Sequence, residues 1–215
     1  MSNKMDFTSL LSNKVNTFIS GEMDYSTLAK YQKLILDELY FDFVLASQNG
    51  GFFYGQALHI YGYTKVPEFH SIDSVNVLLD KEYGNIFGNL IAFGQDLFGN
   101  QFCFDKSSNT IILFNSETGE RETLGQKFDG WVRVLYDQLE YLTGIIILEN
   151  WNSNNHLEFG QRLYPKIPFI MGGEYGVKNL YAAAFPAFLK AYANIARQVY
   201  NLPDGTKVKL KIDNQ

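Results

Sequence analysis

Two short apolar segments separated by a turn constrain the fold of this chain more than any other feature. Residues 90–93 read Leu-Ile-Ala-Phe and residues 102–104 read Phe-Cys-Phe, and the turn between them contains two glycines, an aspartate and an asparagine. Alternation at period two around such a turn is typical of a β-hairpin that buries one face. We therefore predict an antiparallel sheet, and residues 110–114, Thr-Ile-Ile-Leu-Phe, are its next predicted strand.

Apolar residues at helical spacing predict several helices around this sheet. The longest amphipathic pattern runs from Phe128 through Trp131, Leu135 and Leu139 to Leu148, and it should pack on one face of the sheet. Other helices are expected at residues 7–19, 26–44 and 186–200, with one helical turn near residues 74–79. The run Asn49-Gly50-Gly51 should end the second of these, because its residues tolerate left-handed backbone conformations.

The remaining segments complete an α+β fold class: a central, mostly antiparallel sheet with helices packed on it, plus a docked C-terminal strand-helix-strand extension. Short strands are predicted at residues 52–54, 57–61, 122–124, 167–171 and 207–212. Residues 202–205, Leu-Pro-Asp-Gly, predict a type I turn. The Asn-rich residues 151–160 are the predicted linker, so we expect a first domain over residues 1–150. Residues 151–215 should dock on it, because so short a segment buries little by itself.

Composition excludes several classes of protein. Only 19% of the 215 residues are charged against 46% hydrophobic, which argues against disorder. No apolar run approaches the roughly 18 residues of a membrane span, and the first residues lack the apolar core of a signal peptide. A single cysteine, Cys103, leaves no internal disulfide framework. These features predict a cytoplasmic protein, and the net charge of −5 argues against nucleic-acid binding.

Motifs that carry chemistry are not found. His59, His70 and His156 stand in no metal-binding arrangement, and we expect neither metal nor cofactor. Gly94 and Gly99 have the spacing of a phosphate loop, but the lysine that such a loop needs is missing. Cys103 lies in an alternating strand and should be a core residue. The sequence contains no nucleophile elbow either, so we predict that the protein is not an enzyme.

The order of these segments is similar to that of the SUKH superfamily, which includes bacterial toxin-immunity proteins and fungal cell-wall-synthesis regulators. The likeness covers residues 28–148: a helix closed by Asn49-Gly50-Gly51, a first strand at 58–62, a hairpin at 90–94 and 98–105, a strand at 110–114 and a Phe-initiated helix at 128–132. Residues 165–174 and 179–181 resemble an extension of some bacterial members and of type VI secretion immunity proteins. The resemblance implies a protein that neutralises a cognate toxin by stoichiometric contact.

Two alternatives of other classes stay open: a regulatory scaffold like the fungal relatives, and a small-molecule-binding protein or enzyme with a cleft between the core and the extension. For the toxin-binding surface, acidic groups would complement a basic partner such as a nuclease, and aromatic groups would anchor it. A solvated surface is the ordinary alternative for each residue. The predicted partner-binding residues are Asp80, Glu82, Tyr83, Phe98, Glu117, Glu120 and Glu122.

Overall fold

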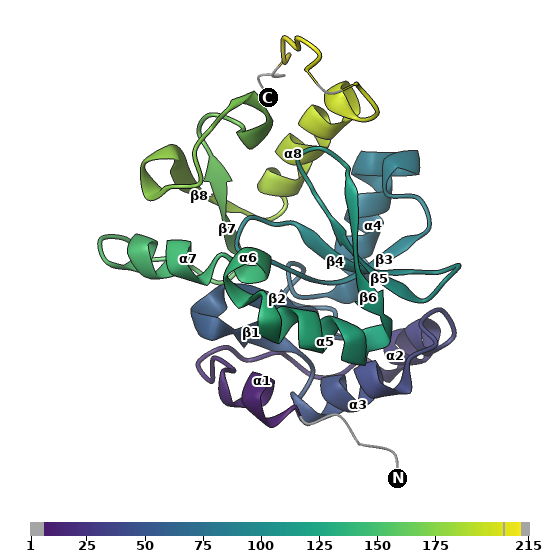
Figure 1. Cartoon of the computed structure of the whole chain (residues 1–215). Helices are drawn as coiled ribbons and strands as arrows, with labels where there is room; N and C mark the ends of the chain where they lie inside the picture. Colours follow the sequence, from purple (N-terminus) through teal and green to yellow (C-terminus); the bar gives the residue numbers. More distant parts are fainter. Residues whose placement is uncertain (1–6, 204, 212–215) are drawn as a thin grey trace.

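The computed structural model describes residues 7–203 and 205–211. At its centre lies a six-stranded antiparallel sheet whose strands are neighbours in chain order (Figure 1). The strands are β1 (Gly51–Phe53), β2 (Leu58–Ile60), β3 (Leu90–Gln95), β4 (Gln101–Asp105), β5 (Thr110–Phe114) and β6 (Arg121–Gln126). Cys103 of β4 pairs with Ala92 of β3 on one side and with Ile112 of β5 on the other. The predicted hairpin and its following strand are thereby confirmed.

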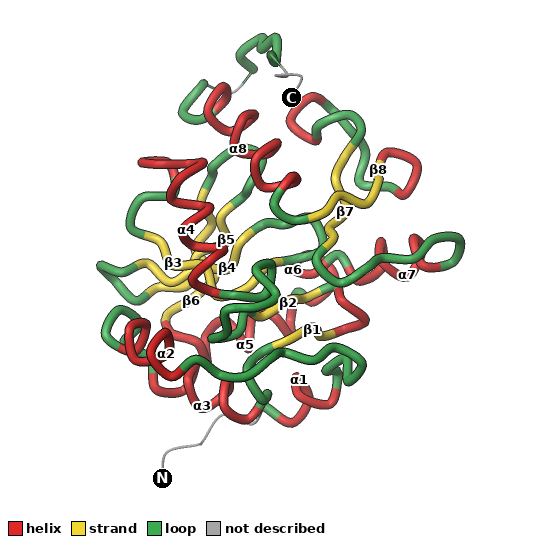
Figure 2. The backbone as a smooth tube through the Cα atoms, turned by 180° about the vertical axis from the view of Figure 1, so that it is seen from behind, coloured by secondary structure: helices red, strands yellow, loops and turns green. Residues whose placement is uncertain are grey.

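Helices cover both faces of the sheet, as expected for an α+β fold. They are α1 (Thr8–Ser12), α2 (Tyr25–Gln32), α3 (Glu38–Ala46), α4 (Ile72–Tyr83), α5 (Lys127–Asp137), α6 (Leu139–Thr143), α7 (Ile145–Asn152) and α8 (Ala187–Val199). Figure 1 shows α5 in front of the sheet, and Figure 2, from behind, shows α4 on the other side. Every residue of β3 is buried, because both of its faces are covered.

The core on the α5 side is mostly aromatic. The Trp131 side chain is fully buried, with ring centroids 5.2 Å from Phe93, 5.4 Å from Phe102 and 5.1 Å from Phe128. Leu135 and Leu142 are also buried, whereas Leu139 is only partly buried. The predicted packing of this region on the sheet is therefore confirmed, and large ring surfaces removed from water stabilise it.

The single helix predicted over residues 128–148 is wrong, because the chain forms three shorter helices there. α5 ends at Asp137, because the next residue, Gln138, leaves the helical region with φ −128° and ψ 37°. Gly144 then separates α6 from α7 with φ +70°. That left-handed conformation is one that glycine adopts without the steric cost of a Cβ atom. The chain therefore bends twice where the apolar spacing alone predicts a straight rod.

Two further predicted helices are too long, because tertiary contacts interrupt or end them. The helix expected over residues 26–44 is split into α2 and α3, since Asp37 caps α3 by accepting from Tyr40 N at 3.2 Å and also accepts from Phe128 N at 2.7 Å. The helix expected over residues 7–19 stops at Ser12. The chain then runs beside β1, where Val15 N donates to Phe52 O at 2.8 Å.

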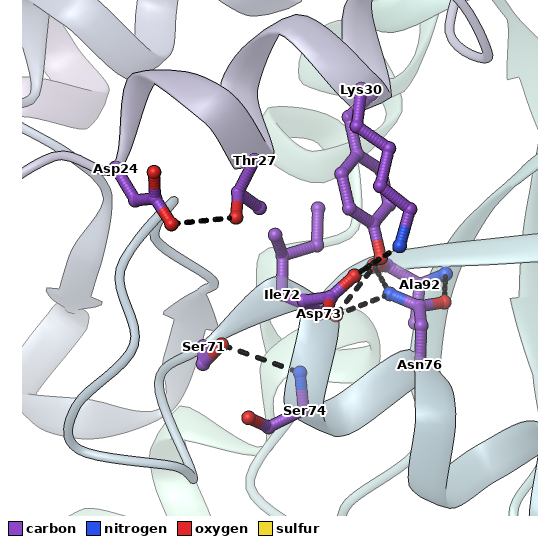
Figure 3. Close-up of polar contacts among 10 residues, drawn as sticks. Asp24, Thr27, Lys30, Ser71, Ile72, Asp73, Ser74, Asn76 and Ala92 are labelled. Carbon is purple, nitrogen blue, oxygen red and sulfur yellow. Dashed lines mark hydrogen bonds and ion pairs between the residues drawn. The ribbon is translucent and has the colours of Figure 1, made fainter.

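The single helical turn expected near residues 74–79 is in fact the twelve-residue α4. Ser71 caps it by accepting from Ser74 N at 3.3 Å, and Lys30 of α2 forms an ion pair with Asp73 (Figure 3). The buried Asn76 amide donates to Ala92 O and accepts from Ala92 N, both at 2.8 Å. This side chain therefore satisfies both backbone groups of a β3 residue and fastens α4 to the sheet.

The C-terminal part of the chain packs against this body. β7 (Gln161–Pro165) and β8 (Leu180–Ala184) form a separate two-stranded sheet, and α8 packs on α4. Its side chains Phe188, Leu189 and Tyr192 are buried in the main core. The docked strand-helix element is thus present. The domain boundary predicted near residue 150 stays a prediction, and α7 runs across that position to Asn152.

Two C-terminal strand predictions fail. Within residues 167–171, Phe169–Met171 form a 3-10 turn, and the sheet is built instead by β7 and β8. Residues 207–211 form no strand, and most of them are exposed, so the extension does not close with a strand in the part that the structure describes. Ile212, the end of that predicted strand, and Asp204, within the predicted type I turn, lie outside the described residues.

Candidate functional site

The turn between β3 and β4 is a meeting point of the fold rather than a solvent-exposed loop. Leu97 at its tip is fully buried. Its backbone N–H donates to Thr143 O at the end of α6 at 3.3 Å, and its carbonyl accepts from Leu163 N of β7 at 3.0 Å. The side chain of Phe188 of α8 also lies against this turn, at Gly99. One predicted hairpin turn therefore holds both the α6–α7 bend and the C-terminal segment.

Phe98 is packed from two sides. The backbone of Gly144 lies so close that a Cβ atom there would meet the Phe98 ring at 2.8 Å. On the other side, the ring makes edge-on contacts with Phe169 and Tyr175, at centroid distances of 5.7 and 5.6 Å. Phe169 and Tyr175 themselves stack at 3.8 Å. Phe98, predicted as an anchor for a partner, is thus first of all an internal anchor for the segment that carries these two rings.

Asp96 braces the same turn from within. Its carboxylate accepts from Phe98 N at 2.9 Å, from Asn100 N at 2.8 Å and from Asn100 Nδ2 at 2.8 Å. Burial raises the pKa of this carboxyl to about 6, against the lowering effect of those hydrogen bonds. Among the described residues it forms no ion pair. The nearby buried guanidinium of Arg162 also lowers the pKa of Asp96, but less than burial raises it.

A cavity of about 700 Å³ opens beside this turn, and we call it the acidic hollow. Its walls come from the β3–β4 turn, the start of β6, the α6–α7 bend and the segment after Met171. Four carboxylates line it, namely those of Asp96, Glu120, Glu122 and Glu140, and three aromatic rings, namely Phe98, Tyr141 and Tyr175. This volume lies within the roughly 300–1,000 Å³ typical of ligand pockets.

None of the four carboxylates of the acidic hollow forms an ion pair among the described residues. Arg121 is the one basic residue that lines it, but its guanidinium donates to Ile86 O at 2.8 Å and to Phe87 O at 3.1 Å. Tyr141 donates its hydroxyl to Glu122 Oε2 at 2.8 Å, and this hydrogen bond raises the pKa of Tyr141 to about 12. The same hydrogen bond holds one carboxylate oxygen of Glu122 in position.

The seven residues predicted from the sequence do not form one surface. Phe98, Glu120 and Glu122 meet in the acidic hollow. Asp80 and Glu82 belong to α4 and do not line it. The remaining two are buried within the chain, Tyr83 and Glu117.

Tyr83 and Glu117 were predicted to bind a partner, but both side chains are buried and offer it no exposed group. The Tyr83 hydroxyl donates to Ser116 O at 2.7 Å. Glu117 Oε1 accepts from Ile170 N at 2.6 Å, while Oε2 has no hydrogen-bond partner among the described residues. Burial raises the pKa of this carboxyl. Four residues of the acidic hollow were not predicted, because only the tertiary fold brings them together: Asp96, Glu140, Tyr141 and Tyr175.

Two smaller hollows adjoin the first. One, of about 590 Å³, shares Glu140 and Tyr141 with it and continues along α6 and α7. The other, of about 410 Å³, shares Glu120 and continues between Met171 and the residues after α8. Large apolar side chains are exposed over this area, namely Tyr141, Ile146, Ile170, Met171, Tyr175, Tyr200 and Leu202. We call the three hollows and these side chains the binding face. Exposed apolar groups gathered around charged ones mark interaction surfaces.

Two of the three histidines, expected to be scattered, are in contact. His59 Nε2 lies 2.9 Å from His70 Nδ1, and both rings are buried. Burial lowers the pKa of His59 well below its usual value and that of His70 to about 4. In the part of the chain that the structure describes, no group of three or more His, Cys, Asp or Glu side chains is placed to hold a metal ion. Cys103 is buried, as predicted for a core residue.

A buried arginine adjoins this pair. Arg162 of β7 lies over the Phe52 ring at 5.2 Å, and its Nη1 donates to Gln161 O at 2.6 Å. With its amide oxygen turned toward the guanidinium, Gln95 accepts from Nε and Nη2 of Arg162, each at 3.3 Å, and from His59 Nδ1 at 3.1 Å. This buried polar network joins β7 to β2 and β3, and it is a structural connection rather than an accessible site.

Comparisons with known proteins agree with this architecture. Residues 28–134 match the model of the SMI1 / KNR4 family (SUKH-1). The crystal structure of Atu4351 from Agrobacterium tumefaciens is similar, with a TM-score of 0.62 at 15% identity, over 90% of this chain and 88% of that one. At that identity the likeness shows the fold alone. A comparison with curated proteins gives no match. Within the described residues, no helix has the length and apolar character needed to cross a membrane.

Proposed function

Because the chain belongs to the SUKH superfamily, we propose that it is an immunity protein that neutralises a cognate toxin by stoichiometric contact. In this proposal the protein acts in the cytoplasm and is not an enzyme, and its inhibition follows from covering the toxin surface. The single observation that carries the proposal is the binding face. It gathers exposed aromatic and aliphatic side chains around four carboxylates that form no ion pair among the described residues.

The composition of the binding face suits protein recognition. Aromatic residues and methionine are enriched in the buried centres of protein interfaces, and specific complexes bury roughly 800 Å² on each partner. Tyr141 and Tyr175 are 62% and 60% exposed, so each offers a large ring at little conformational cost. The carboxylates would steer a basic partner, such as a nuclease, toward this face and repel acidic proteins.

A second candidate, a small-molecule-binding protein or enzyme, is favoured by one observation. Asp96 lies in a cavity with its pKa raised to about 6, as general acids and bases often do. However, both of its oxygens already accept hydrogen bonds from its own turn. The carboxyl thus has a structural role that needs no substrate, and the immunity proposal is the stronger one. The structure holds no observation that favours the regulatory-scaffold alternative.

The test is a titration of the cognate toxin with this protein, with toxin activity as the readout. Stoichiometric covering predicts that inhibition saturates at a fixed molar ratio and that a complex of that ratio elutes from a sizing column. Complete inhibition by a small fraction of one equivalent would indicate catalysis and refute the proposal. A double variant of the binding face, Tyr141→Ala with Tyr175→Ala, should weaken inhibition. Tyr25→Ala, which removes a 72% exposed ring on α2, should not.

A further inference from the structure

We propose that the acidic hollow receives an arginine side chain from a loop of the partner protein, held by Glu122 and Glu140 and stacked on the exposed tyrosines. This inference rests on the proposed function and names the chemistry that the partner must bring. The inference depends on the shape, the charge and the aromatic walls of this cavity together, and not on its carboxylates alone.

Charge selects a cation. Four carboxylates line the cavity, those of Asp96, Glu120, Glu122 and Glu140, against one basic residue among the described ones, Arg121, whose guanidinium bonds to backbone carbonyls. A cavity with low-dielectric walls and charge of one sign concentrates the field inside it. Such a site disfavours phosphate groups and therefore nucleic acid. The occupant must carry positive charge into the cavity.

Aromatic walls select the kind of cation. Tyr175 stacks on Phe169 at 3.8 Å, so one face of its ring is backed and the other is available. Tyr141 is held by its hydrogen bond to Glu122. A planar guanidinium stacks on such rings and can bond a carboxylate through two parallel N–H groups, whereas an ammonium group is a strongly hydrated point charge. These walls therefore favour arginine over lysine.

Glu122 supplies an oriented acceptor. Tyr141 occupies its Oε2, and no described residue donates a hydrogen bond to Oε1. Glu140 is exposed on the facing α6 and likewise forms no ion pair among the described residues. Two acceptors on separate elements can bond different edges of one guanidinium. A cation bound there would form ion pairs with both carboxylates and reduce the repulsion between them.

Size points to a protein segment rather than to a lone ion. The cavity measures about 700 Å³, and it continues into the neighbouring hollows along α6–α7 and beyond Met171. One arginine side chain fills only part of that space, so neighbouring residues of a loop would fill the rest. Apolar residues beside the arginine would meet Ile146 and Met171, which are both exposed.

The first experiment uses the full chain and a defined probe. Amide chemical shifts are followed by NMR during titration with N-acetyl-arginine amide, with N-acetyl-citrulline amide as its neutral isostere and N-acetyl-lysine amide as a second cation. We expect saturable shifts at residues 96–100, 120–122, 140–144 and 175. Binding should be roughly tenfold weaker for citrulline, since one charge-assisted pair is lost, and weaker for lysine than for arginine.

Variants assign the binding to the cavity. The double change Glu122→Gln with Glu140→Gln should abolish the arginine-dependent shifts. Glu38→Gln, a matched change at an exposed carboxylate of α3, should leave them unchanged. Equal shifts with arginine and citrulline, or shifts that survive the double variant, would overturn the inference. Stronger binding of lysine than of arginine would overturn it as well.

The toxin titration separates this inference from the proposed function. If the double variant still neutralises the toxin with unchanged affinity, the immunity role stands and the arginine site is refuted. If the arginine probe binds as described but no toxin is neutralised, the site stands and the proposed function fails. Both proposals are supported if the double variant weakens toxin binding by at least tenfold. One arginine of the toxin, replaced by the neutral residue Gln, should then give the same loss.

Discussion

Replacing Phe98 by alanine should loosen the C-terminal segment from the rest of the molecule. The ring is 6% exposed and lies between the backbone of Gly144 and the rings of Phe169 and Tyr175. Truncating a buried phenylalanine costs about 3–5 kcal/mol. Because Phe98 also lines the acidic hollow, water can enter the space that is left, and we expect a loss near 3 kcal/mol. The segment that carries Phe169 and Tyr175 loses its support at the same time.

Urea unfolding and amide hydrogen exchange test both parts of this prediction. Urea unfolding of the Phe98→Ala variant should show the lower free energy of unfolding. Exchange should accelerate most at Leu163 and Ile170, whose N–H groups bond to Leu97 O and to Glu117. The control is Tyr175→Ala, which removes a ring that is 60% exposed and should cost less than about 1 kcal/mol. A loss below about 1 kcal/mol for Phe98→Ala, or exchange that is unchanged at Leu163, would refute the reasoning.

Three further predictions follow from single side chains. Gly144→Ala should cost about 2–4 kcal/mol in urea unfolding, because strain at φ +70° adds to the contact with Phe98, whereas Gly172→Ala, with φ +86° and nothing within 4 Å, should cost about 1 kcal/mol. Trp131→Ala should cost about 3–5 kcal/mol, and a loss under about 1 kcal/mol would contradict its burial. His70 has its folded-state pKa lowered to about 4, so the unfolded chain binds its proton first as the pH falls. Stability should therefore drop by up to about 3 kcal/mol between pH 6.5 and 4, and the H70Q variant should show a shallower drop.

The sequence predicted those parts of the fold that depend on local pattern. The strands at residues 90–95, 101–105 and 110–114 follow from alternation over a few residues, and the stop after α3 follows from glycines. The break before α3 depends on Asp37 bonding Phe128 N, a contact across 91 positions of sequence. No local pattern contains that information. The bend at Gly144 did leave a signal, since a glycine inside an apolar helical pattern often ends a helix.

The acidic and aromatic character of the candidate site was predicted from the sequence, but most of its residues were not. Glu120 and Glu122 follow from the acidic character of one turn, and Phe98 from its position in the hairpin. Tyr141 and Tyr175 could not be joined to them, because a helix and a separate segment bring those rings into place only after folding. The same tertiary contacts bury Tyr83 and Glu117, which local composition alone marks as surface residues.

The burial of the β3–β4 turn has a consequence during synthesis on the ribosome. Leu97 and Phe98 emerge with the hairpin, but β7, which bonds to Leu97, and the segment with Phe169 and Tyr175, which packs on Phe98, are translated later. At roughly 5–20 residues per second, these apolar side chains stay uncovered for several seconds. A chain that terminates early would keep them exposed, as a feature that chaperones and proteases recognise in incomplete proteins. Completion of the C-terminal segment thus distinguishes a finished molecule from a fragment.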